Sequence, residues 1–133
     1  MILAVLLALL PATACAPARA VPDVPPQTTP AWFADPTKSI PCYGRTLGTC
    51  VSGVLSVEFH AGATREERQA AVNAVGGRVV GGGGTQYYVH MPSVTTRAGL
   101  DSVMVRLREL PQVRQISVYD TSPASIDEAA PAS

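Results

Sequence analysis

The chain has 133 residues, a length that leaves room for one domain. Its 10 basic and 10 acidic residues give a formal net charge of zero, so charge favours neither nucleic acid nor an anionic membrane as a partner. Once both ends are set aside, roughly 70 residues remain for a core, and domains of that size are usually only marginally stable.

The N-terminus has the features of an export signal. Residues 1–10 are almost wholly apolar, and small residues follow them. Such a stretch is too short to span a bilayer, so residues 1–20 are predicted to be a signal peptide that directs the chain to the cell envelope or the exterior. Two cleavage positions remain open. Cleavage after the Ala-Arg-Ala sequence that ends at Ala20 would leave Val21 as the first mature residue. Alternatively, the segment before Cys15 resembles a bacterial lipobox, and Cys15 would then carry a lipid anchor, the one membrane attachment expected of this chain.

The other two cysteines support export. Cys42 and Cys50 are an even pair, separated by seven residues that include two glycines. In an oxidising compartment this predicts a local disulfide that stabilises by about 2–3 kcal/mol. Two cysteines without a nearby second pair or a histidine cluster fall short of a metal site, so no metal is expected.

The composition divides the rest of the mature chain into three parts. Residues 21–40 are Pro-rich and are predicted to be an extended tether without its own core, residues 41–120 to be the domain, and residues 121–133 to be a disordered tail. Trp32 and Phe33 are exceptions within the tether. We expect them to pack back on the domain, with an exposed contact surface as the alternative.

The first half of the domain reads as a strand followed by a helix. Leu55, Val57 and Phe59 alternate within residues 54–59, which is typical of a half-buried strand. Residues 64–67 form a Thr-x-x-Glu capping box that predicts a helix start, and the helix should run to about residue 75, where two glycines end it.

The second half predicts two strands, a helix and a last strand. Residues 78–80 and 86–91 read as strands that Gly81–Gly84 links as a flexible hairpin, and residues 113–119 read as the last strand, with Ile116 and Val118 on one face. Before the last strand a helix is predicted, which carries one apolar stripe and ends at Pro111. The stripe consists of Leu100, Val103, Met104, Leu107 and Leu110. This order predicts an α+β fold of the ferredoxin-like βαββαβ type, a four-stranded antiparallel sheet with two helices on one face.

The sequence lacks motifs of catalysis and of cofactor binding. His60 and His90 stand at strand ends without the Cys, Asp or Glu arrangement of a metal site. The glycine run leads into a strand, whereas phosphate loops lead into a helix, and the adjacent Tyr87 and Tyr88 face opposite sides of a strand, unlike an RNA-binding platform. We therefore expect no enzyme, no cofactor and no nucleic-acid partner.

Three sequence segments resemble the propeptide and inhibitor domain of subtilisin-type serine proteases, most closely the fervidolysin-type prodomain. Leu55–Thr64 resembles its opening strand and turn, and Ala74–Gly82 resembles the phrase that ends its first helix and begins the next strand. Leu107–Val113 resembles the end of its second helix, with Leu-Pro before a Val-initiated strand. The resemblance spans about residues 54–119.

The resemblance implies a protein that inhibits a subtilisin-like serine protease or helps it to fold, and we expect this chain to act as a free-standing monomer. In this family the sheet face opposite the helices docks on the protease, and the end of the last strand enters the active-site cleft. The matching cleft-contact residues are Tyr119, Asp120, Thr121 and Ser122, with Tyr119 expected in a pocket. The alternative function is an adaptor of the cell envelope that uses the sheet face or Trp32-Phe33 to hold a partner that is not a protease.

Overall fold

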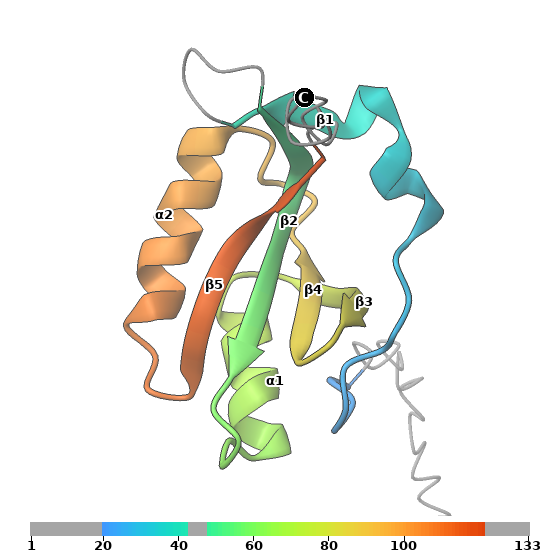
Figure 1. Ribbon diagram of the computed structural model, residues 1–133. Coiled ribbons are helices and arrows are strands. Elements are labelled where there is room, and N and C mark those ends of the chain that lie inside the picture. Colours follow the sequence, from blue (N-terminus) through green and yellow to red (C-terminus); the bar gives the residue numbers. More distant parts are fainter. Residues whose placement is uncertain (1–19, 43–47, 122–133) are drawn as a thin grey trace, which may run out of the picture.

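The structure, a computed structural model, describes residues 20–42 and 48–121 (Figure 1). Residues 1–19 of the predicted signal peptide, which include the lipidation candidate Cys15, and residues 122–133 of the predicted tail, which include Ser122, lie outside the described residues. Two short 3-10 helices, five strands and two α-helices follow one another: η1 (Ala31–Ala34), η2 (Pro36–Lys38), β1 (Ser39–Pro41), β2 (Thr49–Phe59), α1 (Arg65–Ala74), β3 (Arg78–Gly83), β4 (Gln86–His90), α2 (Arg97–Arg108) and β5 (Val113–Asp120).

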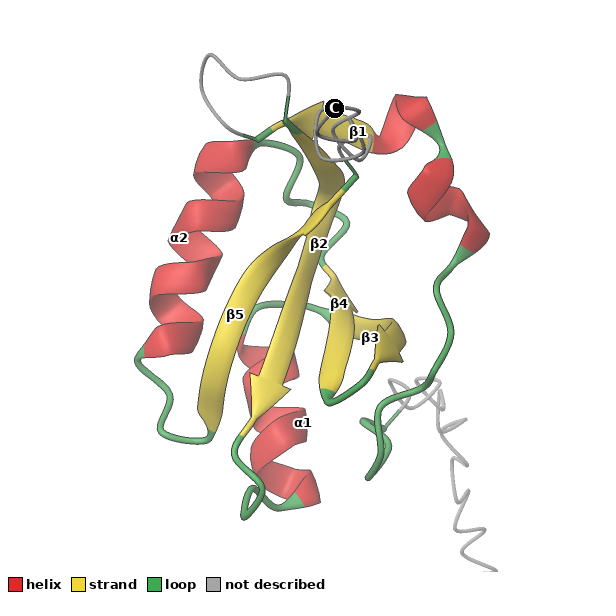
Figure 2. Ribbon diagram, in the orientation of Figure 1, coloured by secondary structure: helices red, strands yellow, loops and turns green. Residues whose placement is uncertain are grey.

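The strands form one antiparallel sheet around β2 (Figure 2). β5 pairs with β2 along one side, and on the other side β1 pairs with the start of β2 and β4 with its later part, with β3 beyond β4. The fold is therefore α+β, with a five-stranded antiparallel sheet and two helices. The prediction of four strands was wrong by one strand. β1 has only three residues and ends in Pro41, so it lacks the alternation that identifies longer strands.

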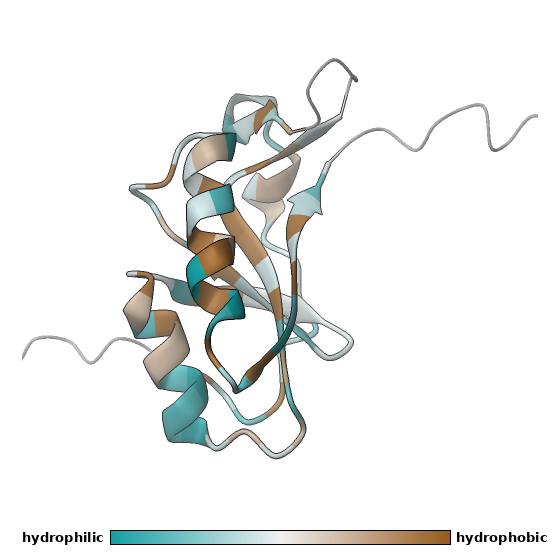
Figure 3. Cartoon of the chain, turned by 90° about the vertical axis from the view of Figure 1, so that its left-hand side faces the viewer, coloured by the Kyte–Doolittle hydropathy of each residue, from teal (hydrophilic) through white to brown (hydrophobic). Residues whose placement is uncertain are grey.

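Both helices begin and end close to where the sequence places them. The Thr64 side chain caps α1 by accepting a hydrogen bond from the Glu67 backbone N–H, as the capping box predicts. Gly76, at φ +64°, follows the end of α1. The first turn of α1 is hydrophilic and its later turns are more apolar, so only the later part approaches the core (Figure 3).

The core lies between the helices and one face of the sheet. The predicted stripe of α2 is buried from Leu100 to Leu107, and Leu110 packs at its margin. The alternating residues Leu55, Val57 and Phe59 of β2 face these helices, as predicted. Ile116 also packs in this layer, so the helix-facing core matches the sequence pattern closely.

An irregularity at Gly53 lets β2 contribute to both faces of the sheet. Val51 and Val54 both pack on the face away from the helices, although strict alternation would place residues three apart on opposite faces. The register between β2 and β5 shifts in this stretch, and Gly53 has φ +68°. A Cβ at Gly53 would lie 2.5 Å from the carbonyl oxygen of Met91 and 2.8 Å from that of Val94. Glycine is therefore required both for the conformation and for the space.

The segment predicted to be an extended tether without its own core packs against the domain. Residues 21–38, which we call the covering segment, start beside α1, pass along β3, and bring Trp32 and Phe33 onto the face of the sheet opposite the helices (Figure 1). Val21 is fully buried, and Phe33 is 3% exposed. The prolines keep much of the segment extended, but its apolar side chains and carbonyl groups find partners on the domain that local sequence does not reveal.

Candidate protein-binding surface

The face of the sheet opposite the helices carries an aromatic cluster, which we define as Trp32, Phe33, Tyr88, His90 and Tyr119. The centroid of the Phe33 ring lies 4.7 Å from that of Trp32, 5.7 Å from that of Tyr88 and 4.7 Å from that of Tyr119. The ring of Trp32 is 4.9 Å from that of His90, and Tyr88 is 5.0 Å from Tyr119. These are spacings of favourable aromatic contacts. The prediction that Trp32 and Phe33 pack back on the domain is confirmed.

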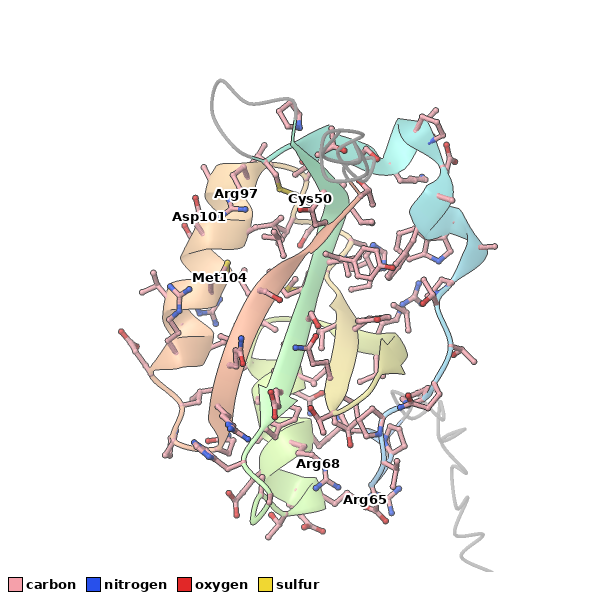
Figure 4. All side chains as sticks on the ribbon, in the orientation of Figure 1. Cys50, Arg65, Arg68, Arg97, Asp101 and Met104 are labelled. Atoms are coloured by element: carbon pink, nitrogen blue, oxygen red, sulfur yellow. A yellow bond between two sulfur atoms is a disulfide. The ribbon has the colours of Figure 1, made fainter. Side chains whose placement is uncertain are left out.

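Polar contacts hold the first part of the covering segment. The Val21 backbone N–H donates to Oε1 of Gln69 at 2.8 Å, and the Tyr87 hydroxyl donates to the Pro22 carbonyl oxygen at 2.7 Å. Burial raises the pKa of Tyr87, so its hydroxyl stays protonated and remains a donor in neutral solution. Arg68, which Figure 4 labels on α1, forms an ion pair with Asp23 at 2.9 Å.

The glycine run lets the covering segment approach β3 directly. A Cβ at Gly81 would lie 2.4 Å from the Thr28 carbonyl oxygen, and one at Gly82 would lie 2.5 Å from that of Pro26. The Gly82 N–H donates to the Thr28 carbonyl oxygen at 3.0 Å. The prediction of a flexible link over Gly81–Gly84 was therefore wrong, because Gly81 to Gly83 belong to β3 and the turn begins at Gly84. The absence of side chains here makes room for the chain's own N-terminal part.

Three of the predicted cleft-contact residues lie at the end of β5, and each makes contacts within the domain. The Tyr119 ring belongs to the aromatic cluster. Asp120 is paired with Cys50 across β2 and β5, and the Thr121 N–H donates to the Thr49 carbonyl oxygen at 2.9 Å. The hydroxyls of Thr49 and Thr121 are 3.0 Å apart. The end of β5 is thus fixed on β2.

A groove of about 880 Å³ lies beside the end of β5. One wall comes from η1, η2 and β1 and includes Pro30, Pro36 and Pro41. The other wall comes from the ends of β2 and β5 and includes Tyr119 and Thr121. A largely apolar groove next to a strand end is a surface suited to an extended peptide.

The predicted disulfide is present between Cys42 and Cys50, whose Cα atoms are 5.7 Å apart. It joins the end of β1 to β2, close to the start of α2, where Figure 4 labels Cys50 and Arg97. The Arg97 side chain approaches the Cys42 sulfur at 3.5 Å and forms an ion pair with Asp101 at 2.9 Å. The bond therefore fixes the residue after β1 to β2, four residues beyond the end of the covering segment.

Replacing both cysteines with serine is expected to lower the free energy of unfolding by about 2–3 kcal/mol, because the unfolded chain gains the entropy of an open loop. Urea denaturation, followed by circular dichroism, measures the change. The unmodified protein under reducing conditions serves as the control and should lose a similar amount. A loss below about 0.5 kcal/mol would contradict a stabilising role for this bond.

The structure also locates the two adjacent tyrosines and the two histidines that the sequence analysis considered. Tyr87 packs in the helix-facing core and Tyr88 on the opposite face, as predicted. His60 is an exposed residue after β2, whereas His90 lies at the end of β4 in the aromatic cluster. Within residues 20–42 and 48–121, no group of three or more His, Cys, Asp or Glu side chains is arranged to hold a metal ion. None of the helices in the same part of the chain has the length and apolar character needed to cross a membrane.

Sequence reasoning missed the contribution of Val51, Val54 and Tyr88 to this surface. The signal that points to it is the glycine run, because consecutive glycines in a strand mark a close approach of another segment. Comparisons with family models, with curated proteins and with solved structures found no match to this chain.

Proposed function

We propose that this chain is a noncatalytic, exported protein-binding domain that inhibits a subtilisin-like serine protease or helps it to fold. The observation that carries the proposal is the pairing of β2 with both β5 and β4, with β3 outside β4. With α1 and α2 in their places, residues 49–120 follow the order strand, helix, strand, strand, helix, strand. We take this unit to be the ferredoxin-like fold that the resemblance implies, with β1 as an addition.

The arrangement of the strand end supports inhibition by the residues after Thr121. The two hydrogen-bonded threonines fix the end of β5, so the following residues would extend from the rim of the groove. A segment that leaves a rigid strand end loses less conformational entropy when it binds than a free peptide does. Tyr119 is held between Phe33 and Tyr88, so entry of its ring into a protease pocket would require the cluster to open.

The covering segment changes the expected docking surface. In the propeptide mode the bare sheet faces the protease, whereas here Trp32 and Phe33 of the covering segment lie on that face. We therefore place the protease contact on the covering segment, the groove and the tail, while the sheet supports these parts from behind.

Export to an oxidising compartment agrees with the disulfide between Cys42 and Cys50.

Removing residues 122–133 is expected to weaken inhibition of a subtilisin-type protease at least about 100-fold, because the part that enters the cleft is lost. The measurement is the inhibition constant of purified residues 21–133 compared with residues 21–121. The cut after Thr121 keeps Tyr119 and the bonds of Thr121, so the domain should remain folded. A matched control replaces residues 122–125 with glycine and serine and keeps the length of the tail.

Two outcomes would overturn this mechanism. Equal inhibition by both lengths would place the activity outside the tail, and digestion of the intact protein without inhibition of several such proteases would remove inhibition altogether.

The second candidate function, an adaptor of the cell envelope, is favoured by the groove and the covered sheet, because these could hold a partner without any free strand end. An adaptor would keep its partner after the tail is removed.

A further inference from the structure

A second cavity, of about 360 Å³, lies at the edge of the aromatic cluster. Five separate parts of the chain meet there: η1, η2, β2, the adjacent ends of β3 and β4, and the loop before α2. The cavity is lined by Trp32, Lys38, Ser52, Arg78, His90, Pro92 and Thr95. The covering segment thus contributes Trp32 and Lys38 to the lining, while Ser52, Arg78 and His90 come from the sheet.

The polar groups in this cavity carry one sign of charge. Arg78 and His90 are direct cross-strand partners of β3 and β4, and Lys38 joins them from η2. No acidic residue lines the cavity, and neither Lys38 nor Arg78 forms an ion pair with another residue in the described part of the chain. The nearby Asp35 accepts hydrogen bonds from the backbone N–H and the hydroxyl of Thr37, and the charge of Lys38 also helps to lower its pKa, but Asp35 does not line the cavity.

This arrangement favours the entry of a negative charge. A positive charge on His90 directly opposite Arg78 is disfavoured, and an anion between the two residues would offset that repulsion. Burial, together with the charges of Arg78 and Lys38, lowers the pKa of His90. The Nδ1 atom of His90 is buried and has no hydrogen-bond partner within residues 20–42 and 48–121. A bound oxygen atom would satisfy that nitrogen once it carries a proton.

The volume and the lining of the cavity favour a carboxylate on a short aliphatic stem over a bare oxyanion. Its volume exceeds what a single oxyanion fills, and the Trp32 ring and Pro92 provide apolar wall. The hydroxyls of Ser52 and Thr95 add donors beside the cations. Arginine binds planar carboxylates with paired donors, and methylene groups pack well against an indole ring.

We propose that this cavity binds a carboxylate group carried on a short aliphatic stem, held by Arg78, Lys38 and His90 against the Trp32 ring. The ligand is either a small free acid or the side chain of an acidic residue on a protein partner. The cavity shares no lining residue with the groove and does not involve the tail, although Trp32 and Lys38 belong to the covering segment. Because Arg78 and Lys38 are exposed, we expect weak binding of an isolated group, so that a partner would use the site to select an acidic side chain.

The test uses two reporters within the purified residues 21–133. Trp32 is the chain's one tryptophan and lies 4.9 Å from His90, so its fluorescence reports on the cavity, and the nuclear magnetic resonance signals of His90 report its titration. The probes are glutarate and the peptide acetyl-Ala-Ala-Glu-Ala-Ala-amide, each at matched ionic strength. The peptide with Gln in place of Glu is the uncharged control, and sulfate is the bare oxyanion control.

We expect saturable binding that raises the pKa of His90 by about one unit and changes the Trp32 emission. Arg78→Gln should weaken binding about tenfold or more, because a hydrogen bond to a charged group is lost. Arg108→Gln, an exposed charge on the far side of α2, should leave binding unchanged. Binding of the Glu peptide would identify a protein side chain as the ligand, and binding of glutarate alone would identify a free acid.

The proposal is overturned if neither carboxylate shifts the His90 titration beyond the effect of sulfate. It is also overturned if Arg78→Gln and Arg108→Gln weaken binding equally. Both substitutions are at exposed positions, so loss of the fold would not confuse the result.

Discussion

Replacing Phe33 with alanine is expected to lower the free energy of unfolding by about 3 kcal/mol, because a nearly buried aromatic side chain is lost and a cavity forms in its place. Phe33 is 3% exposed and contacts the rings of Trp32, Tyr88 and Tyr119. No other side chain of the covering segment makes as many ring contacts among the described residues. The loss should therefore affect the attachment of the whole segment to the sheet.

Chemical denaturation measures this effect, with Val24→Ala as the matched control. Val24 belongs to the same segment but is 71% exposed, so its truncation should change stability by no more than about 0.5 kcal/mol. If Phe33→Ala were as mild as Val24→Ala, the covering segment would contribute little to the fold. The second face would then be available to partners in the unmodified protein.

Replacing Gly53 with alanine is expected to cost about 3 kcal/mol. A left-handed backbone costs an alanine roughly 1–2 kcal/mol, and forcing a methyl group into a packed site costs a similar amount. Both apply here, because Gly53 has φ +68° and its Cβ would meet the carbonyl oxygen atoms of Met91 and Val94. The Gly53 carbonyl oxygen also accepts a hydrogen bond from the Met91 N–H at 2.7 Å, so displacement of this backbone would disturb β4 as well.

Gly62→Ala is the matched control for this second substitution. An added Cβ at Gly62 meets no atom within 4 Å, and its φ lies outside the positive range. It should leave the urea midpoint unchanged or raise it slightly, since alanine reduces the entropy of the unfolded chain. Equal midpoints for Gly53→Ala and Gly62→Ala would show that the irregularity in β2 tolerates a side chain.

The helix-facing half of the fold could be predicted from the sequence because its signals are local. The capping box at Thr64 and the stripe from Leu100 to Leu107 depend on residues three or four positions apart. The alternation in β2 likewise needs only neighbouring residues. These patterns identify elements and their buried sides without knowledge of what lies opposite.

The second face could not be predicted in the same way, because its contacts join residues far apart in the chain. Thr28 meets Gly82, and Phe33 meets Tyr119. A Pro-rich stretch reads as an extended tether because proline removes donors, but its carbonyl groups still accept hydrogen bonds. In the sequence, the close approach of the covering segment to β3 is visible only as a run of glycines, and such a run is equally typical of a flexible loop.

Protection of the Gly82 amide from hydrogen exchange tests the central claim most directly, because its hydrogen bond goes to Thr28 of the covering segment at 3.0 Å. The account predicts slow exchange in purified residues 21–133 and markedly faster exchange in the Phe33→Ala variant, with the amides of β2 still protected in both. Rapid exchange of Gly82 in the unmodified protein would contradict the account. The sheet face would then be open, and a partner would be expected to dock on the bare sheet and not on the covering segment.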